Sequence, residues 1–110
     1  HVAIVLPSNP VRGRPWYDAA YDPIWAAACE LDVPVCFHGI QGAYQEHLGN
    51  RYLDGLMLMH AAAHPLEMML AMGGLLTGGV FDRFPGLRAV FLVCSAGWVP
   101  LWLWRLDEEQ

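Results

Sequence analysis

Three short apolar runs along the chain have the composition of β-strands. They span Val2–Leu6, Val33–Phe37 and Leu87–Val93, and none of them alternates cleanly between apolar and polar positions. Such continuous apolar runs are typical of strands that are buried on both faces, as in a parallel sheet. Pro34 falls at the start of the second run, where the missing backbone donor is tolerated.

A helical pattern follows each apolar run. Asp22-Pro23 is expected to cap and open the first helix, Pro65 opens a second that stops near Gly78-Gly79, and Pro100 opens a third. Apolar residues recur at helical spacing after each of these starts. His64 directly precedes Pro65, so we expect it to cap the second helix rather than to bind a metal. The alternation of strands and helices predicts an α/β fold with a parallel sheet.

The connection between the second strand and the second helix is too long for a plain loop. Residues 52–60 have the pattern of a short extra helix, and the polar stretch Gly39–Asn50 forms the remaining loop. A long polar loop at the carboxyl end of a parallel strand is where α/β proteins build their sites. His47 and His60 lie in this connection, where exposure to solvent is expected.

Composition narrows the class of protein. The chain has 110 residues, of which 55% are hydrophobic and 15% charged, whereas soluble domains carry about 25% charged residues. We therefore expect something larger to cover its apolar surface.

No apolar run reaches the roughly 18 residues of a membrane span. His1 leads directly into strand-like sequence and the acidic last turn is a poor helix end, so we expect the natural chain to continue at both ends.

Charge and cysteine content exclude further classes. The net charge is −5 and no Lys/Arg cluster is present, which argues against a nucleic-acid partner. Three cysteines, Cys29, Cys36 and Cys94, lie within apolar segments. An odd number of cysteines in such surroundings predicts reduced thiols and a cytoplasmic location.

His38 is the strongest candidate for chemistry, because it ends the second strand and neutral imidazole is the commonest metal-ligating side chain. Spacing alone leaves open the alternative of a buried histidine that is hydrogen-bonded to a neighbouring strand. Asn9 lies just past the first strand and can either bind substrate or form a turn before Pro10. Trp98 can either line the pocket or pack a helix on the sheet. Cys94 is read as an inert buried thiol rather than a nucleophile.

Four stretches of the chain resemble the amidohydrolase-related superfamily of metal-dependent TIM-barrel enzymes. The closest branch contains aminocarboxymuconate semialdehyde decarboxylase and the resorcylate-type decarboxylases. The resemblance implies a partial (β/α)8 barrel of about three βα units, in which residues 1–110 supply strands four to six of a single domain. The stretches are Tyr21–Trp25 leading into Val33–His38, His64–Glu67, Gly79–Arg88, and Gly97–Pro100 with Arg105–Asp107.

The same resemblance implies a function. His38 falls on the superfamily's strand-five ligand for a divalent metal, here expected to be zinc, while the first-strand and last-strand ligands lie outside this sequence. The implied activity is that of a hydrolase or carboxy-lyase acting on a small carboxylated or carbonyl substrate, in a full-length protein that forms homo-oligomers. The catalytic residue itself is not identified.

The end of the sixth strand departs from the superfamily, because Phe91–Gly97 contains neither His nor Glu. The alternative is therefore a non-catalytic barrel relative, or an inactive truncated fragment, with a structural or partner-binding role. We expect the 110 residues alone to be inactive and either to aggregate or to pair with another copy, because three βα units cannot close a barrel.

Overall fold

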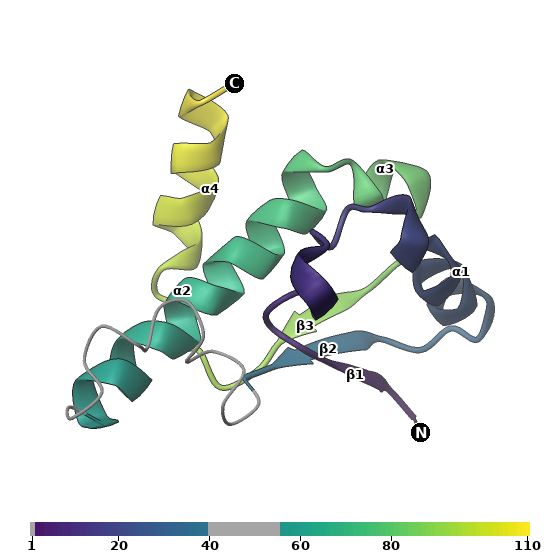
Figure 1. The fold of residues 1–110 in the computed structure, drawn as a ribbon. Helices are drawn as coiled ribbons and strands as arrows, with labels where there is room; N and C mark the ends of the chain where they lie inside the picture. Colours follow the sequence, from purple (N-terminus) through teal and green to yellow (C-terminus); the bar gives the residue numbers. More distant parts are fainter. Residues whose placement is uncertain (1, 40–55) are drawn as a thin grey trace.

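Three parallel strands form the centre of the computed structural model, which describes residues 2–39 and 56–110 (Figure 1). They are β1 (Ile4–Pro7), β2 (Val35–His38) and β3 (Ala89–Phe91), and β2 lies between the other two. Val35 is in register with Ile4 on one side and with Ala89 on the other. The predicted parallel sheet is confirmed, although each strand begins two residues later than the sequence indicates.

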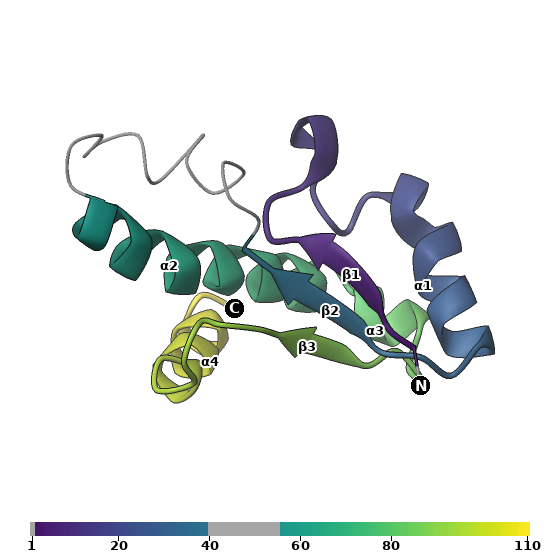
Figure 2. The same cartoon turned by 90° about the horizontal axis from the view of Figure 1, so that it is seen from below.

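The helices cover one face of this sheet. Figures 1 and 2 show helices α1, α2 and α3, whose bounds follow below, on the same side of the strands. Val35 and Phe37 are fully buried on this covered face. The intervening Cys36 is in register with Val5 and Val90, and the exposed fractions of these two valines are 60% and 39%. Within residues 2–39 and 56–110 the strands are therefore covered on one face, not on both as their apolar sequences predict.

Four helices and two single turns of 3-10 helix accompany the sheet in the described ranges. No helix in these ranges is long and apolar enough to cross a membrane. The 3-10 turns are η1 (Val11–Gly13) and η2 (Ala19–Tyr21), and the helices are α1 (Asp22–Glu30), α2 (Leu56–Thr77), α3 (Val80–Arg83) and α4 (Val99–Glu108).

Asp22 is the first residue of α1 and not its cap, contrary to the sequence prediction. Tyr21 occupies the cap position with a helical backbone and makes no side-chain cap bond. A capping side chain needs an extended backbone at its own residue, and the preceding turn η2 rules that out here. The capping role passes to Asp18, which is extended and accepts a 2.8 Å hydrogen bond from the backbone N–H of Ala20.

Helix α2 runs without a break through Pro65, so the predicted extra helix and the second helix are one element. His64 consequently lies within the helix and does not cap it, which corrects the sequence prediction. Pro65 cannot donate a backbone hydrogen bond, but apolar side chains are buried on both sides of it along the helix, and tertiary packing supplies most helical stability. The buried apolar residues form two clusters: Met59 packs with Ala63, whereas Met68, Ala71 and Leu75 join the main core.

The region before α2 is described only in part. His60 is exposed, as predicted. His47 and the rest of the polar loop, together with the first part of the predicted extra helix, lie outside the described residues.

Aromatic side chains fill the core beneath the carboxyl ends of β1 and β2. The ring centroid of Phe37 lies 5.4 Å from that of Trp16 and 5.4 Å from that of Phe91. The Trp16 indole N–H also donates a 3.0 Å hydrogen bond to the Ser8 carbonyl. Aromatic packing of this kind fixes the chain that leaves β1.

Arg83, at the end of α3, joins distant parts of the fold. Its guanidinium donates to the carbonyl oxygens of Gly78 and Tyr17 at 3.0 and 3.3 Å and to Oδ1 of Asp22 at 3.2 Å. Gly79–Arg88, one of the four stretches that carry the resemblance, thus contains the residue that binds α3 to the start of α1.

Candidate metal and ligand site

His38 is the last residue of the central strand. Its register partner in β1 is Pro7, so it stands at the carboxyl edge of the sheet. Side chains alternate along a strand, which places His38 on the same face as Cys36, the face that the helices leave uncovered. The side chain is half-buried. The structure therefore puts this imidazole where α/β proteins gather functional groups.

His64 approaches the same edge from α2. Its side chain is 7% exposed, and its ring lies directly against Gly39, the residue after His38. Burial lowers the pKa of His64, and the nearby His60 and then His38 lower it further. Each effect disfavours the imidazolium, so His64 is held as neutral imidazole near neutral pH.

The histidines of α2 are a feature that the sequence interpretation missed. The ring centroids of His60 and His64 are 4.2 Å apart, with an angle of 55° between the ring planes. Their spacing of four residues is the available signal, since side chains four apart share one face of a helix. That signal is hidden when a helix is assumed to begin at Pro65.

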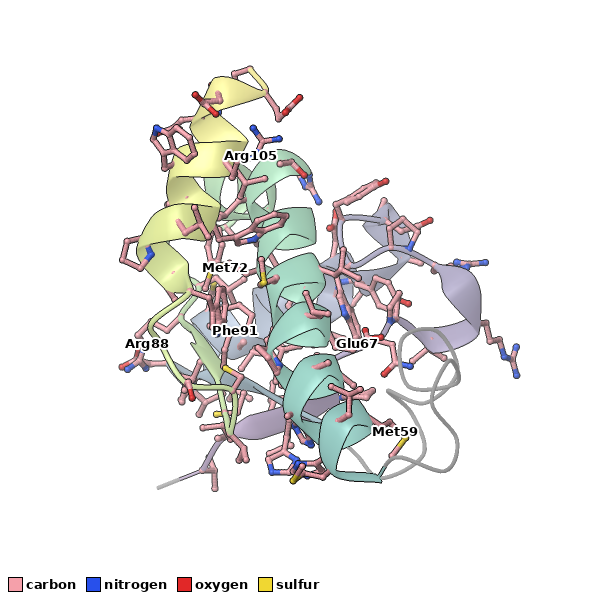
Figure 3. The ribbon with its side chains drawn as sticks, turned by 90° about the vertical axis from the view of Figure 1, so that its left-hand side faces the viewer. Met59, Glu67, Met72, Arg88, Phe91 and Arg105 are labelled. Atoms are coloured by element: carbon pink, nitrogen blue, oxygen red, sulfur yellow. The ribbon has the colours of Figure 1, made fainter. Side chains whose placement is uncertain are left out.

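Asn9 lies in a different cavity from the two histidines of α2. It is buried two residues past the end of β1 and lines a cavity of about 400 Å³ together with Ser8, Trp16 and Glu67. Glu67 comes from α2 and is labelled in Figure 3. The cavity therefore joins the loop after β1 to the middle of α2, and a substrate-binding role for Asn9 stays a prediction.

Trp98 packs against the core, and its indole N–H already has a hydrogen-bond partner. Its indole N–H donates a 2.8 Å hydrogen bond to the carbonyl of Cys94, and the half-buried ring contacts the core cluster. This contact holds the loop after β3 against the start of α4. A role in lining a substrate pocket stays a prediction.

Cys94 is buried at the end of β3. Burial raises the pKa of its thiol, and Sγ lies 3.4 Å from the carbonyl oxygen of Ser95. A protonated thiol is a poor nucleophile. The geometry favours the interpretation of Cys94 as an unreactive buried thiol.

The donor set in this chain is incomplete for a metal. Across residues 2–39 and 56–110, no three His, Cys, Asp or Glu side chains are grouped so as to hold a metal ion. An imidazole at a strand end fits zinc and similar divalent metals in donor type, so His38 can supply one ligand. Further protein ligands of such a site would have to come from beyond the described residues.

A known protein family matches this chain along nearly its whole length. The amidohydrolase family matches residues 5–109. The chain therefore belongs to the amidohydrolase family, and the resemblance seen in the sequence is confirmed.

Particular relatives agree with this assignment. γ-Resorcylate decarboxylase from Rhodococcus jostii is 33% identical over 102 residues, which cover 86% of this chain and 29% of that protein. Decarboxylase orsB from Emericella nidulans is 29% identical over 100 residues, or 77% of this chain and 27% of the relative.

A solved structure shows the fold. The crystal structure of an amidohydrolase from Mycobacterium avium subsp. paratuberculosis superposes with a TM-score of 0.81 at 27% identity, over 97% of this chain and 29% of that one. The expected α/β architecture of a partial barrel is thus confirmed. The chain spans less than a third of each of these relatives.

Proposed function

We propose that this chain forms strands four to six of a (β/α)8 barrel in a metal-dependent hydrolase or carboxy-lyase that acts on a small carboxylated or carbonyl compound. The observation that carries the proposal is the position of His38, at the carboxyl edge of the central parallel strand and on the uncovered face of the sheet. In barrel enzymes this edge holds the active site and this face is the barrel interior.

The names of two relatives favour a carboxy-lyase, because both are decarboxylases. A divalent metal at this edge, zinc in our proposal, would act as a Lewis acid toward the carboxylate or carbonyl of the substrate. His38 would contribute one neutral nitrogen donor. The lowered pKa of His64 keeps a competing positive charge away from the place where a cation would bind.

The test compares the full-length protein with its His38→Ala variant. Metal content is measured by plasma mass spectrometry, and carbon dioxide release is measured with γ-resorcylate, the compound named in one relative. We expect the variant to lose most of both. Cys36→Ala is the matched control, because Cys36 lies on the same strand and face but is not a proposed ligand. Unchanged metal content in His38→Ala would overturn the assignment.

A non-catalytic relative is the second candidate, favoured by the end of β3. Val93, Cys94 and Ser95 follow that strand, and the raised pKa of Cys94 leaves no proton-handling group among them. The flanking sequence separates the two candidates. A His-x-His on the first barrel strand and an Asp ending the last one would favour the enzyme, and their absence would favour the structural role.

We also propose a cytoplasmic location and a homo-oligomeric full-length protein. Support for the location comes from the cysteines, because Cys29, Cys36 and Cys94 are all free thiols and reducing compartments keep thiols in that state. Fractionation of the source cells and light scattering of the purified full-length protein test the two statements.

A further inference from the structure

His60 and His64 form a pair that the proposed function does not use. They stand one turn apart on the continuous helix α2, and their ring centroids are 4.2 Å apart. Two histidines at this spacing on one helix face are the arrangement by which helices present a pair of imidazoles to a single metal ion, as in the His-x-x-x-His core of zinc-dependent proteases.

Both rings border the same cavity. This space of about 340 Å³ is lined from α2 by His60, Ala61, His64 and Pro65, and from the loop after β3 by Val93, Cys94 and Ser95. A water molecule takes up about 30 Å³ in the liquid, so the cavity holds a cation together with several waters or a small ligand. None of the described residues that line it carries a carboxylate, which disfavours Mg²⁺ and Ca²⁺, since these cations prefer oxygen ligands.

We infer that His60 and His64 form a two-histidine binding site for a borderline transition-metal ion, namely Cu²⁺, Ni²⁺ or Zn²⁺. Imidazole suits these metals, and affinity at nitrogen sites is highest for Cu²⁺. Within the described ranges no third His, Cys, Asp or Glu is grouped with the pair to complete a protein ligand set. The remaining coordination positions are therefore open to water or to a small ligand in the cavity.

This site uses other ligands than the one proposed at His38, although His64 lies against Gly39, the residue after His38. The pair lies on α2, whereas His38 lies on β2 and on the face of the sheet that the helices leave open. The two-histidine site needs no ligand from outside the described residues. It can therefore be tested on soluble preparations of the 110-residue chain, with the association state of each variant matched by light scattering, whatever the outcome for His38.

The experiment titrates Cu²⁺ and Ni²⁺ into the chain by calorimetry. His1 and His47 are first replaced by Ala, which leaves His38, His60 and His64 as the only histidines. We expect one equivalent of ion to bind, with Cu²⁺ coordination by nitrogen visible in the electron paramagnetic resonance spectrum. Because chelation by two linked ligands raises affinity through effective concentration, His60→Ala and His64→Gln should each weaken binding at least about tenfold.

His60→Ala is the decisive variant, since His60 is exposed and its removal leaves the core intact. Circular dichroism verifies the fold of each variant. His38→Ala serves as the control and should keep the affinity of the three-histidine background. The inference is overturned if His60→Ala binds as tightly as the background, or if His38→Ala weakens binding as much as His60→Ala does.

Discussion

The ring of His64 occupies the space that a side chain at Gly39 would need. A β-carbon built on Gly39 would stand 2.6 Å from Cε1 and 2.7 Å from Nδ1 of His64. Contacts this short force one of the groups to move, and both residues are buried. The glycine after the strand-end histidine is therefore required for the close approach of α2 to β2.

Gly39→Ala should consequently destabilise the fold. We expect a loss of about 1–3 kcal/mol in the free energy of unfolding, the usual cost of overpacking a buried position, measured by chemical denaturation. Gly97→Ala is the matched control, because nothing lies within 4 Å of a β-carbon at Gly97. Equal stability of the two variants would show that His64 does not lie against Gly39.

Cys94 should react slowly with thiol reagents. Burial raises the pKa of its thiol above the ordinary value, and the thiolate is the reactive form. At pH 8 we expect iodoacetamide to modify Cys29 and Cys36, which are half-buried, well before Cys94. The rate at Cys94 should rise only at higher pH. Mass spectrometry of the digested protein measures the three rates, and fast labelling of Cys94 in the folded chain would contradict the inert reading.

Val93 has a left-handed backbone, with φ of 58°. This region is unfavourable for β-branched residues and costs about 1–2 kcal/mol for an L-residue, whereas Asn tolerates it. The side chain is 65% exposed, so little packing is lost on replacement. Val93→Asn should therefore stabilise the protein by about 1 kcal/mol, which thermal unfolding at low protein concentration can detect.

Val90→Asn is the comparison for this variant. Val90 is also partly exposed but lies within β3, where valine is preferred over asparagine. Its replacement should lower the melting temperature. A drop of similar size for Val93→Asn would mean that Val93 does not have a left-handed backbone.

The uncovered face of the sheet should make the 110-residue chain associate with itself. Val5 and Val90 are exposed on that face, and the outer strands β1 and β3 have free edges in the described part of the chain. Exposed apolar patches and free strand edges both promote association. Size-exclusion chromatography with light scattering should show dimers or larger species.

A charged variant tests whether this face is responsible. Val5→Lys should shift the chain toward monomer, because a lysine on the open face opposes sheet-to-sheet contact. Leu31→Lys is the control, since Leu31 is similarly exposed at the end of α1 but lies away from the face. A wild-type chain that is monomeric and unfolds cooperatively would contradict the expectation of association.

The sheet could be predicted from the sequence because its signal is local. Three apolar runs of strand length that alternate with helical patterns admit few arrangements other than a parallel sheet, and His38 could be placed at a strand end for the same reason. The half-covered state of the sheet could not be predicted. Apolar runs indicate that a face is to be buried, but they do not indicate which chain segment buries it.

The errors arose where tertiary packing overrides a local rule. Pro65 indicates a helix start when judged alone, yet α2 continues through it because apolar residues both before and after Pro65 are buried. The position of His64 and its approach to Gly39 follow from that continuity. Asp22 has the residue type of a cap, but η2 ends immediately before it. Each correction concerns a contact with an element that is distant in the sequence or unpredicted.

The bonds of Arg83 bear on how the polypeptide acquires this fold during synthesis. Its acceptors on Tyr17 and Asp22 lie 66 and 61 residues earlier in the chain. At ribosomal rates of about 5–20 residues per second, a delay on the order of 3 to 13 seconds separates the emergence of these partners. During that interval the start of α1 lacks the hydrogen bonds that Arg83 later donates. The corner between α1 and α3 can therefore close only after most of the segment has been synthesised.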